Sequence, residues 1–319
     1  MASSPPVPGR EVHTGEVHAR RIRGRPAPRR QVRGRSRWRG YVYVLPALAV
    51  YVAFAVLPAL HTAYLSLFEW DGVTLGDWVG LGNYAEIFQD PILRRSVFNA
   101  LVLVVFFSFV PIVLGLLSTG LLARHRRPGM GAYRFLFMLP QVVPLVAVGV
   151  TWRWLYGDDG VVNQAFRAVG LDGATRAWLG DFGAALIAVG LVGTWVLSGL
   201  CMMLFLSGVQ KVDPSLYEAA RIDGAGPVRE FVSVTLPHLR GELAVAMTVT
   251  TVAALASFDI VYVTTNGGPG EQTTVPGLLV YRLAFSEGKV GLAAALAVVL
   301  GVLILAIVYL INRLSRSET

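Results

Sequence analysis

Charged residues are scarce in this chain. They make up 15% of its 319 residues, whereas a soluble globular domain usually carries about 25%. Hydrophobic residues account for 54%, and the mean hydropathy is +0.57. This balance excludes an ordinary soluble domain and predicts a protein that crosses a membrane several times.

Cysteine and histidine provide little for metal or redox chemistry. Cys201 is the single cysteine, so no disulfide within one chain and no cysteine-based zinc site can form. The five histidines are dispersed and lack the spacing of metal ligands. We therefore expect no metal site and no cofactor bound by this chain.

Motifs for nucleotide and acyl chemistry are also missing. The sequence contains no GxxxxGK[ST] phosphate loop, no HExxH pattern and no GxSxG nucleophile elbow. It therefore predicts no catalytic residues and no nucleotide hydrolysis by the phosphate-loop route. Asp259 is the one acid well inside a long apolar segment, which is too little for the carboxylate relay of a proton-driven carrier. A transport protein of this composition needs a partner that supplies the energy.

Six apolar segments are each long enough for a membrane span of about 20 residues. They are residues 41–65, 99–122, 133–155, 183–207, 241–263 and 290–311. Their continuous apolar composition favours helices over barrel strands. The sequence therefore predicts an all-α integral membrane protein with six transmembrane helices. Pro140 and Pro144 remove backbone donors from the third segment and predict a kink in it.

Residues 1–40 form a basic tail with eleven arginines, five prolines and two acids. This composition predicts disorder. The basic region is too long for a cleavable signal peptide, and a full-length apolar span follows it. We expect a cytoplasmic tail that sets the orientation, with contact to anionic membrane lipid as a further role. Nucleic acid is not an expected partner, because no aromatic residue beyond Trp38 accompanies the arginines.

The distribution of Lys and Arg predicts the orientation in the membrane. With the N-terminus in the cytoplasm, 21 of the 28 cations lie on the cytoplasmic side and seven on the outside. Both termini are then cytoplasmic, and so is the loop 208–240. The external loops are residues 68–98, 156–182 and 264–289.

The cytoplasmic stretch 213–237 contains the residues that typically begin and end two short helices. Asp213 suits an N-cap and Pro214 the first helical position. Gly224 allows the left-handed conformation that ends helices. Gly226 and Pro227 begin a second helix, and Pro237 is expected to end it. Two short helices that meet at a glycine corner predict a docking surface for a partner.

The same stretch resembles the EAA motif of bacterial ATP-binding-cassette importer permeases. The motif is formed here by Glu218-Ala219-Ala220, then Gly224, then Val234-Thr235-Leu236-Pro237, with Val234 where the family usually has Ile. Further segments resemble the carbohydrate-uptake branch of the maltose and glycerol-phosphate type. They are Val79–Tyr84, Arg134-Phe135 with Leu139-Pro140, Phe258–Val263 and Thr264–Pro269. The resemblance covers residues 40–312.

The resemblance implies the type I importer permease architecture, with residues 95–312 as the transmembrane core and 208–240 as the coupling loop. It also implies a second homologous permease, a cytoplasmic ABC ATPase dimer that uses the ATP, and an extracytoplasmic sugar-binding protein, all in or at the membrane of a bacterial cell. The helix that carries the EAA residues would insert into the ATPase. The coupling residues implied are Tyr217, Glu218, Ala219, Ala220, Asp223, Gly224 and Pro237. Glu218 would contact a basic residue of the ATPase.

A neutral sugar needs hydrogen-bonding groups and an aromatic face rather than a countercharge. On the family-like segments and the apolar spans, the candidates for the solute path are Trp195, Asp259, Tyr262, Asn266, Gly267 and Gly268. Asp259 is expected near the outer end of its span, where helix capping or ion pairing is an alternative role.

Other interpretations of the sequence remain open. The chain could be a self-sufficient secondary carrier or channel for a small polar solute, or a membrane scaffold that recruits a soluble protein. The EAA-like stretch could be an ordinary amphipathic loop in which Glu218 and Arg221 form a pair three residues apart.

Overall fold

The structure is a computed structural model that describes residues 37–123 and 129–316. Residues 1–36 of the predicted tail, and the predicted cytoplasmic arginines at 124, 126 and 127, lie outside the described residues. The chain divides into two units, residues 1–52 and 53–319. In the first unit the structure describes helix α1 (Arg37–Tyr51), which contains Pro46, and the start of η1.

Helices make up most of the remaining structure. In chain order they begin with η1 (Val52–Val56), α2 (Leu57–Leu65), α3 (Gly82–Gln89), α4 (Pro91–Val104), η2 (Val105–Phe109), α5 (Val110–Ala123), α6 (Met130–Val142), α7 (Leu145–Leu155), α8 (Val161–Ala168) and η3 (Asp172–Ala174). They continue with α9 (Ala185–Val209), α10 (Pro214–Ile222), α11 (Pro227–Glu230), η4 (Phe231–Thr235), α12 (Leu236–His238), α13 (Arg240–Leu255), α14 (Asp259–Thr264), α15 (Pro276–Phe285) and α16 (Val290–Arg316). Two short strands, β1 (Phe68–Glu69) and β2 (Asp77–Trp78), pair antiparallel with Phe68 opposite Trp78. The prediction of a helical protein is confirmed, apart from this small ribbon.

Four helices in the described part of the chain are long and apolar enough to cross a membrane. They are Tyr43–Leu65, Pro91–Gly120, Ala185–Val209 and Val290–Ser315. The pair Gly131–Val142 and Leu145–Leu155 adds a fifth if the two helices form one broken span. Hydropathy therefore predicted the location of a helix, or of a helix pair, for five of the six segments.

The pair α6 and α7 is bent by 102° at the predicted proline kink. Val143 and Pro144 both have extended backbone, with ψ of 133°. A proline disfavours the helical conformation of the residue before it, so Pro144 accounts for the break. Pro140 lies inside α6.

The remaining predicted segment, 241–263, is not a continuous helix. α13 ends at Leu255 and α14 begins at Asp259. Gly277 of α15 packs against the break, where an added Cβ would lie 3.1 Å from the carbonyl oxygen of Ser257. The expectation of one helix through this segment was wrong, because the apolar run in the sequence carries no sign of the packing that α15 makes with the break.

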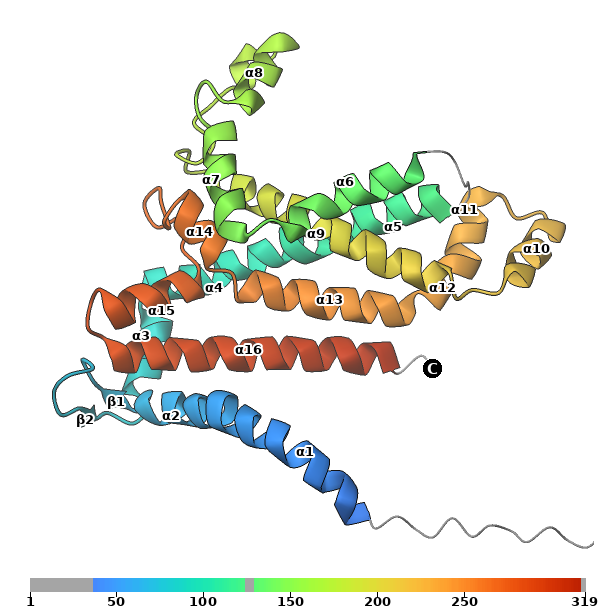
Figure 1. The fold of residues 1–319 in the computed structure, drawn as a ribbon. Helices are drawn as coiled ribbons and strands as arrows, with labels where there is room; N and C mark the ends of the chain where they lie inside the picture. The colour runs from blue at the N-terminus through green and yellow to red at the C-terminus, as the bar shows by residue number, and fades with distance from the viewer. Residues whose placement is uncertain (1–36, 124–128, 317–319) are drawn as a thin grey trace, which may run out of the picture. The chain divides into compact units, whose positions relative to one another are not determined.

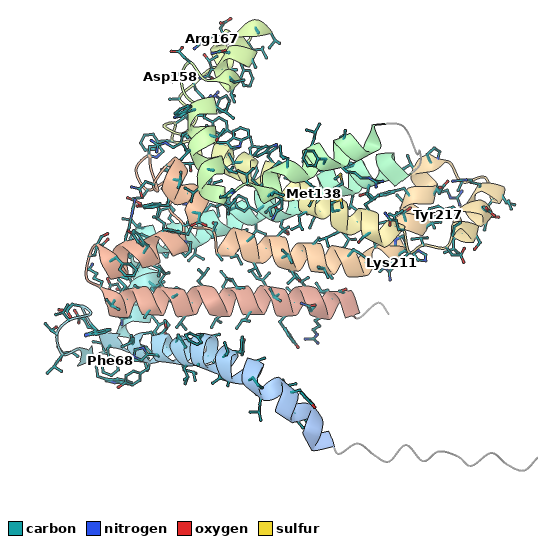
Figure 2. All side chains as sticks on the ribbon, viewed as in Figure 1. Phe68, Met138, Asp158, Arg167, Lys211 and Tyr217 are labelled. Carbon is teal, nitrogen blue, oxygen red and sulfur yellow. The ribbon has the colours of Figure 1, made fainter. Side chains whose placement is uncertain are left out.

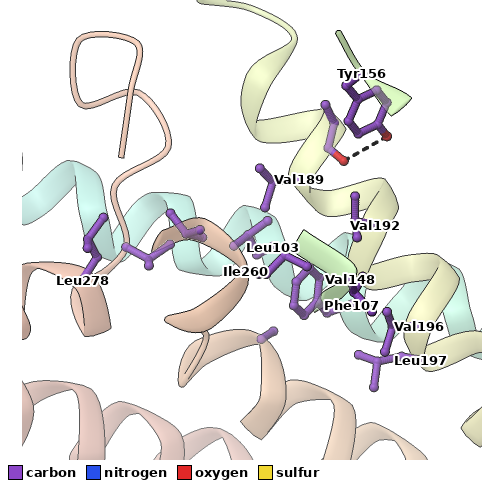
Figure 3. Packing of buried hydrophobic residues seen from close by; sticks show 14 residues of the cluster. Leu103, Phe107, Val148, Tyr156, Val189, Val192, Val196, Leu197, Ile260 and Leu278 are labelled. Atoms are coloured by element: carbon purple, nitrogen blue, oxygen red, sulfur yellow. Dashed lines mark hydrogen bonds between the residues drawn. The ribbon is translucent and has the colours of Figure 1, made fainter. Parts of the chain in front are cut away.

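α9 is the most buried of the four apolar helices. It packs against α5, α6 and η2, and Figure 3 shows Phe107 of η2 in the same apolar cluster as Val192 and Val196 of α9. Gly193 faces the ring of Phe107, and Gly199 faces the backbone carbonyl of Phe137, so neither position has room for a Cβ. Small residues allow membrane helices to approach this closely.

Hydroxyl groups tie η2 to its neighbours. Thr250 of α13 donates to Oγ of Ser108 at 2.7 Å, and Thr194 of α9 donates to the carbonyl oxygen of Phe106 at 2.5 Å. Interhelical bonds of this kind contribute about 0.6 kcal/mol each in membrane proteins. They fix α9 and α13 against η2.

Within residues 53–319, the short helices gather at the two ends of α9 and α13. Figure 1 shows α10, α11 and α12 at one end, and α7, α14 and α15 at the other. α16 ends on the side of α10–α12. The two candidate sites described next lie at opposite ends of α13.

Candidate coupling surface and solute cavity

The first predicted helix of the polar stretch is present as α10. Pro214 is its first residue, and Oδ1 of Asp213 accepts a hydrogen bond from the backbone N–H of Ser215 at 2.9 Å. This bond lowers the pKa of Asp213 below its ordinary value, which keeps the cap ionised at the positive end of the helix. Gly224 has a left-handed φ of 74°, and its N–H donates to the carbonyl of Arg221 at 3.0 Å. The helix therefore begins and ends as the sequence predicted.

The predicted coupling residues on α10 and its corner are largely accessible. Glu218, Ala219, Asp223 and Gly224 are exposed, whereas Tyr217 and Ala220 are half-buried. The neighbouring Ile222 is 86% exposed. A short, capped helix with a small-residue surface and an apolar tip is physically suited to enter a cleft of another protein.

Pro237 does not end the second helix. α11, η4 and α12 follow one another without a break, and Pro237 lies inside α12. A proline lacks the N–H of an α-helical bond and crowds the carbonyl four residues earlier. The wider π turn of η4 directly precedes it and accommodates the ring. The helix ends one residue later than predicted, at His238, and Leu239 leads into α13.

Arg221 pairs with Glu230 across the glycine corner. Its Nε and Nη2 each donate to a carboxylate oxygen of Glu230 at 3.2 Å. The Glu230 side chain is 7% exposed and that of Arg221 is 63% exposed. The bond to Glu230 raises the pKa of Arg221. The hydrogen-bonded ion pair of Arg221 is thus with Glu230, whereas Glu218, the partner that the amphipathic-loop interpretation gave it, adds a smaller charge attraction.

Two further contacts hold this corner to the helices beside it. The hydroxyls of Tyr217 and Thr235 are hydrogen-bonded at 3.2 Å. Nζ of Lys211 donates to Oε1 of Glu242, in the first turn of α13, at 2.7 Å. Figure 2 shows Lys211 and Tyr217 at this end of the molecule.

A groove of about 480 Å³ lies between α10 and α5. Leu116 and Gly120 line it from α5, Tyr217 and Arg221 from α10, and Phe231 from η4. Because the groove separates α10 from α5, α10 packs little on that helix. Its polar contacts with α11 and η4 hold it instead.

A second cavity, of about 330 Å³, lies at the break between α13 and α14. Gln141 and Val143 line it from the bend of α6 and α7, and Ser257, Phe258 and Asp259 line it from the break. The hydroxyl of Ser257 is buried and has no hydrogen-bond partner among the described residues. An unpartnered buried hydroxyl is costly, and this one belongs to a side chain that lines the cavity.

The six predicted solute-path residues do not form one site. Asp259 is exposed and lines the cavity. Tyr262 stacks on the lining residue Phe258, with 5.2 Å between ring centroids. Trp195 is not among the residues that line the cavity. Its ring packs edge-to-face with that of Trp152, with 5.6 Å between the ring centroids.

Asn266, Gly267 and Gly268 instead shape the loop after α14. Asn266 and Gly267 have left-handed φ angles of 47° and 86°. The carbonyl of Gly267 accepts from the N–H of Thr273 at 3.1 Å, and the carbonyl of Gly268 accepts from the Thr273 hydroxyl at 2.8 Å. In this structure their contacts fold the loop back on itself.

Polar residues that the sequence analysis did not select anchor the same loop. Arg282 of α15 bonds to the Glu271 carboxylate, at 2.9 Å for the closer oxygen, and to the carbonyl of Asn266. Nδ2 of Asn99 in α4 donates to the carbonyls of Gln272 and Thr274 at 2.9 and 2.8 Å. These contacts span up to 175 residues of sequence, so no local pattern could indicate them.

The chain is similar to permease proteins over most of its length. The model of the family described as binding-protein-dependent transport system inner membrane component matches residues 111–317. The chain is 34% identical over 279 residues to the trehalose/maltose transport system permease protein MalF of Thermococcus litoralis. This match covers 85% of this chain and 92% of that protein. It is 34% identical over 285 residues to the diacetylchitobiose uptake system permease protein NgcF of Streptomyces coelicolor, covering 84% of this chain and 80% of that protein.

A solved structure shares the fold. In the crystal structure of a bacterial ABC transporter involved in the import of the acidic polysaccharide alginate, one chain matches with a TM-score of 0.74 at 23% identity. The match covers 88% of this chain and 96% of that chain.

Proposed function

Because this chain belongs to the family of inner-membrane components of binding-protein-dependent transport systems, we propose that it is the permease subunit of an ATP-driven sugar importer. Relatives named as permease proteins for trehalose/maltose, diacetylchitobiose and lactose support the class of solute. A cavity that combines hydroxyl, amide, carboxylate and aromatic groups fits a neutral polyol ring.

The proposed assembly contains four kinds of component. This chain pairs with a second homologous permease, a cytoplasmic ABC ATPase dimer binds below them, and an extracytoplasmic sugar-binding protein delivers the solute. ATP is used by the ATPase, and this chain binds no cofactor of its own. The family description, which names transport that depends on a binding protein, supports this set of partners.

The proposed topology has six crossings with both termini in the cytoplasm. α13 and α14 together form the crossing that the break interrupts. The excess of Lys and Arg on the predicted cytoplasmic side supports this orientation. The end of α16 on the side of α10–α12 agrees with it.

The exposed, capped helix α10 is the observation that carries the coupling role. ATP would close the ATPase dimer, and α10 would move with the cleft that holds it. Packed helices move as rigid bodies, so the movement would change access to the cavity from one side of the membrane to the other. Glu218 would contact a basic residue of the ATPase, and Ala219 and Ala220 would allow the close approach.

Substitutions in α10 and its corner test this role in cells that express the complete transporter. We expect Glu218→Lys, which places a cation against the basic partner, and Gly224→Asp, which adds a side chain at a left-handed position, to abolish uptake of radiolabelled maltose, trehalose or diacetylchitobiose. Membrane levels of the chain should stay at the wild-type value, as measured by immunoblot. Glu86→Lys, at an exposed glutamate of α3, is the matched control and should transport normally. Full uptake by the Glu218→Lys variant would remove the coupling role.

The solute is proposed to bind in the cavity at the α13–α14 break. Phe258 supplies an aromatic face, and Ser257, Gln141 and Asp259 supply hydrogen-bonding groups. The combination of a ring face with polar groups at its rim is what recognition of a sugar requires.

A further inference from the structure

The side chains of Arg221 and Glu230 bond to each other across the turn that the backbone makes at Gly224. The backbone turns at Gly224, and nine positions separate the two charged residues. Nε and Nη2 of Arg221 bond to different oxygens of the carboxylate, both at 3.2 Å, and such a bidentate pair fixes the orientation of the guanidinium as well as its position. The pair therefore links the last turn of α10 directly to the end of α11.

A second contact on the same face of α10 makes the link resistant to rotation. Tyr217 lies one helical turn before Arg221, and residues four apart share a helix face. Its hydroxyl meets Thr235, which is 4% exposed in η4. α10 is thus held at two points to one continuous segment, α11 followed by η4, and this segment leads through α12 to α13.

The carboxylate end of the ion pair is shielded from solvent. The side chain of Glu230 is 7% exposed, whereas that of Arg221 is 63% exposed, and removing a partner from a buried carboxylate is costly. On the other side of α10, Ala219 and Ile222 stay exposed, and Glu218 is exposed beside Arg221 at the rim of the groove. The helix therefore has one face fixed to its own chain and another available to a partner.

We propose that the Arg221–Glu230 pair is a positioning strut that fixes the angle of α10 against α11 and η4. Without it, the left-handed Gly224 is a hinge, and a displacement of α10 is absorbed at the corner. With it, the displacement reaches α13 and the cavity at its far end. The direction of that displacement rests on the proposed function, whereas the fixed angle does not.

The fixed angle is tested by the distance between α10 and α13 in the purified full-length chain in nanodiscs. Spin labels are attached to Ile222→Cys and Val245→Cys, which are 86% and 50% exposed in the wild type, while Cys201 is fully buried. We expect a narrow distance distribution, which Arg221→Ala and Glu230→Gln broaden. Arg221→Lys, which keeps the charge, should broaden it less. Arg229→Ala, which removes a neighbouring exposed arginine of α11, is the control and should leave it narrow. An unchanged distribution in Arg221→Ala would overturn the strut, and this variant remains informative if Glu230→Gln fails to accumulate.

The transport consequence is measured in proteoliposomes that hold the complete transporter, with maltose and trehalose as probes. In Arg221→Ala the amount of sugar imported per ATP hydrolysed should fall on the order of tenfold, within the usual range of coupling between sites. The ATPase should still co-purify with the variant, and Arg221→Lys should recover part of the ratio. A wild-type ratio in Arg221→Ala would refute the strut as a coupling device. Absence of sugar uptake by the wild type would instead refute the proposed function, and the distance measurement would still decide the strut.

Discussion

At the scale of single residues, Ser257 is the residue at which the proposed solute site can be tested. Its hydroxyl is buried, lacks a partner among the described residues and belongs to a side chain that lines the 330 Å³ cavity. A buried hydroxyl without a partner reduces stability by about 1–3 kcal/mol. Under the proposed function, a solute hydroxyl that reached this buried oxygen would supply the partner that it lacks.

Ser257→Ala should therefore weaken transport affinity without weakening the fold. Loss of one hydrogen bond of about 1 kcal/mol predicts a KM for sugar uptake roughly fivefold higher, with an unchanged or higher unfolding temperature. Ser207→Ala is the matched control, because Ser207 is exposed on α9 and its hydroxyl already donates to the carbonyl of Leu204 at 2.7 Å. An unchanged KM together with a lower unfolding temperature would show that Ser257 is structural.

Residues with local roles could be predicted from sequence, and residues with distant partners could not. Asp213 and Gly224 act on their own helix, so their chemistry and spacing indicated a cap and a left-handed corner, and both are present. The role of Glu230 could not be predicted, because it pairs with Arg221 across a turn. The two residues are nine positions apart in the sequence, which is not a helical repeat. Asp259 was selected as the acid of an apolar segment and does line the cavity, but its role in transport stays a prediction.

At the scale of elements, close approach to α9 organises the centre of the fold. Gly193 lies where an added Cβ would overlap the ring of Phe107. Phe107 and the neighbouring Ser108 belong to η2, which α13 also contacts through Thr250. The position of α13 thus depends on a glycine in a different helix.

Gly193→Ala should destabilise the protein by about 1–3 kcal/mol, the usual cost of overpacking a core. Thermal unfolding in detergent measures the change. Gly301→Ala on α16 is the control, because an added Cβ there has no neighbour within 4 Å, and the better helix propensity of alanine should make it neutral or stabilising. Adding Phe107→Leu to Gly193→Ala should recover part of the loss. Equal effects of the two glycine substitutions would contradict this packing.

Element boundaries show where hydropathy stops being informative. Pro144 gave a local reason for the bend between α6 and α7, and the bend is present. The break after Leu255 has no proline or glycine of its own, and its packing partner Gly277 lies 22 positions further along the chain. Hydropathy depends only on the length and composition of an apolar run, so it predicted one continuous helix for the segment 241–263.

At the scale of the whole molecule, α13 is the direct connection between the two candidate sites. It starts at Arg240, just after α12 and Leu239, and ends at Leu255, two residues before Ser257. Its 16 residues span about 24 Å at 1.5 Å per residue. A rigid rod of this length would convert a displacement of α10 into a change at the cavity wall.

We propose that a partner ATPase drives solute movement through this chain by way of α10. The most direct test is uptake of radiolabelled maltose and trehalose by proteoliposomes, with ATP on the side of the ATPase. We expect uptake when this chain, its partner permease, the ATPase and the binding protein are all present with ATP. We expect none from this chain alone under a proton or sodium gradient, and none from the complete set carrying Glu218→Lys. Gradient-driven uptake by the isolated chain would show a self-sufficient carrier and contradict the account.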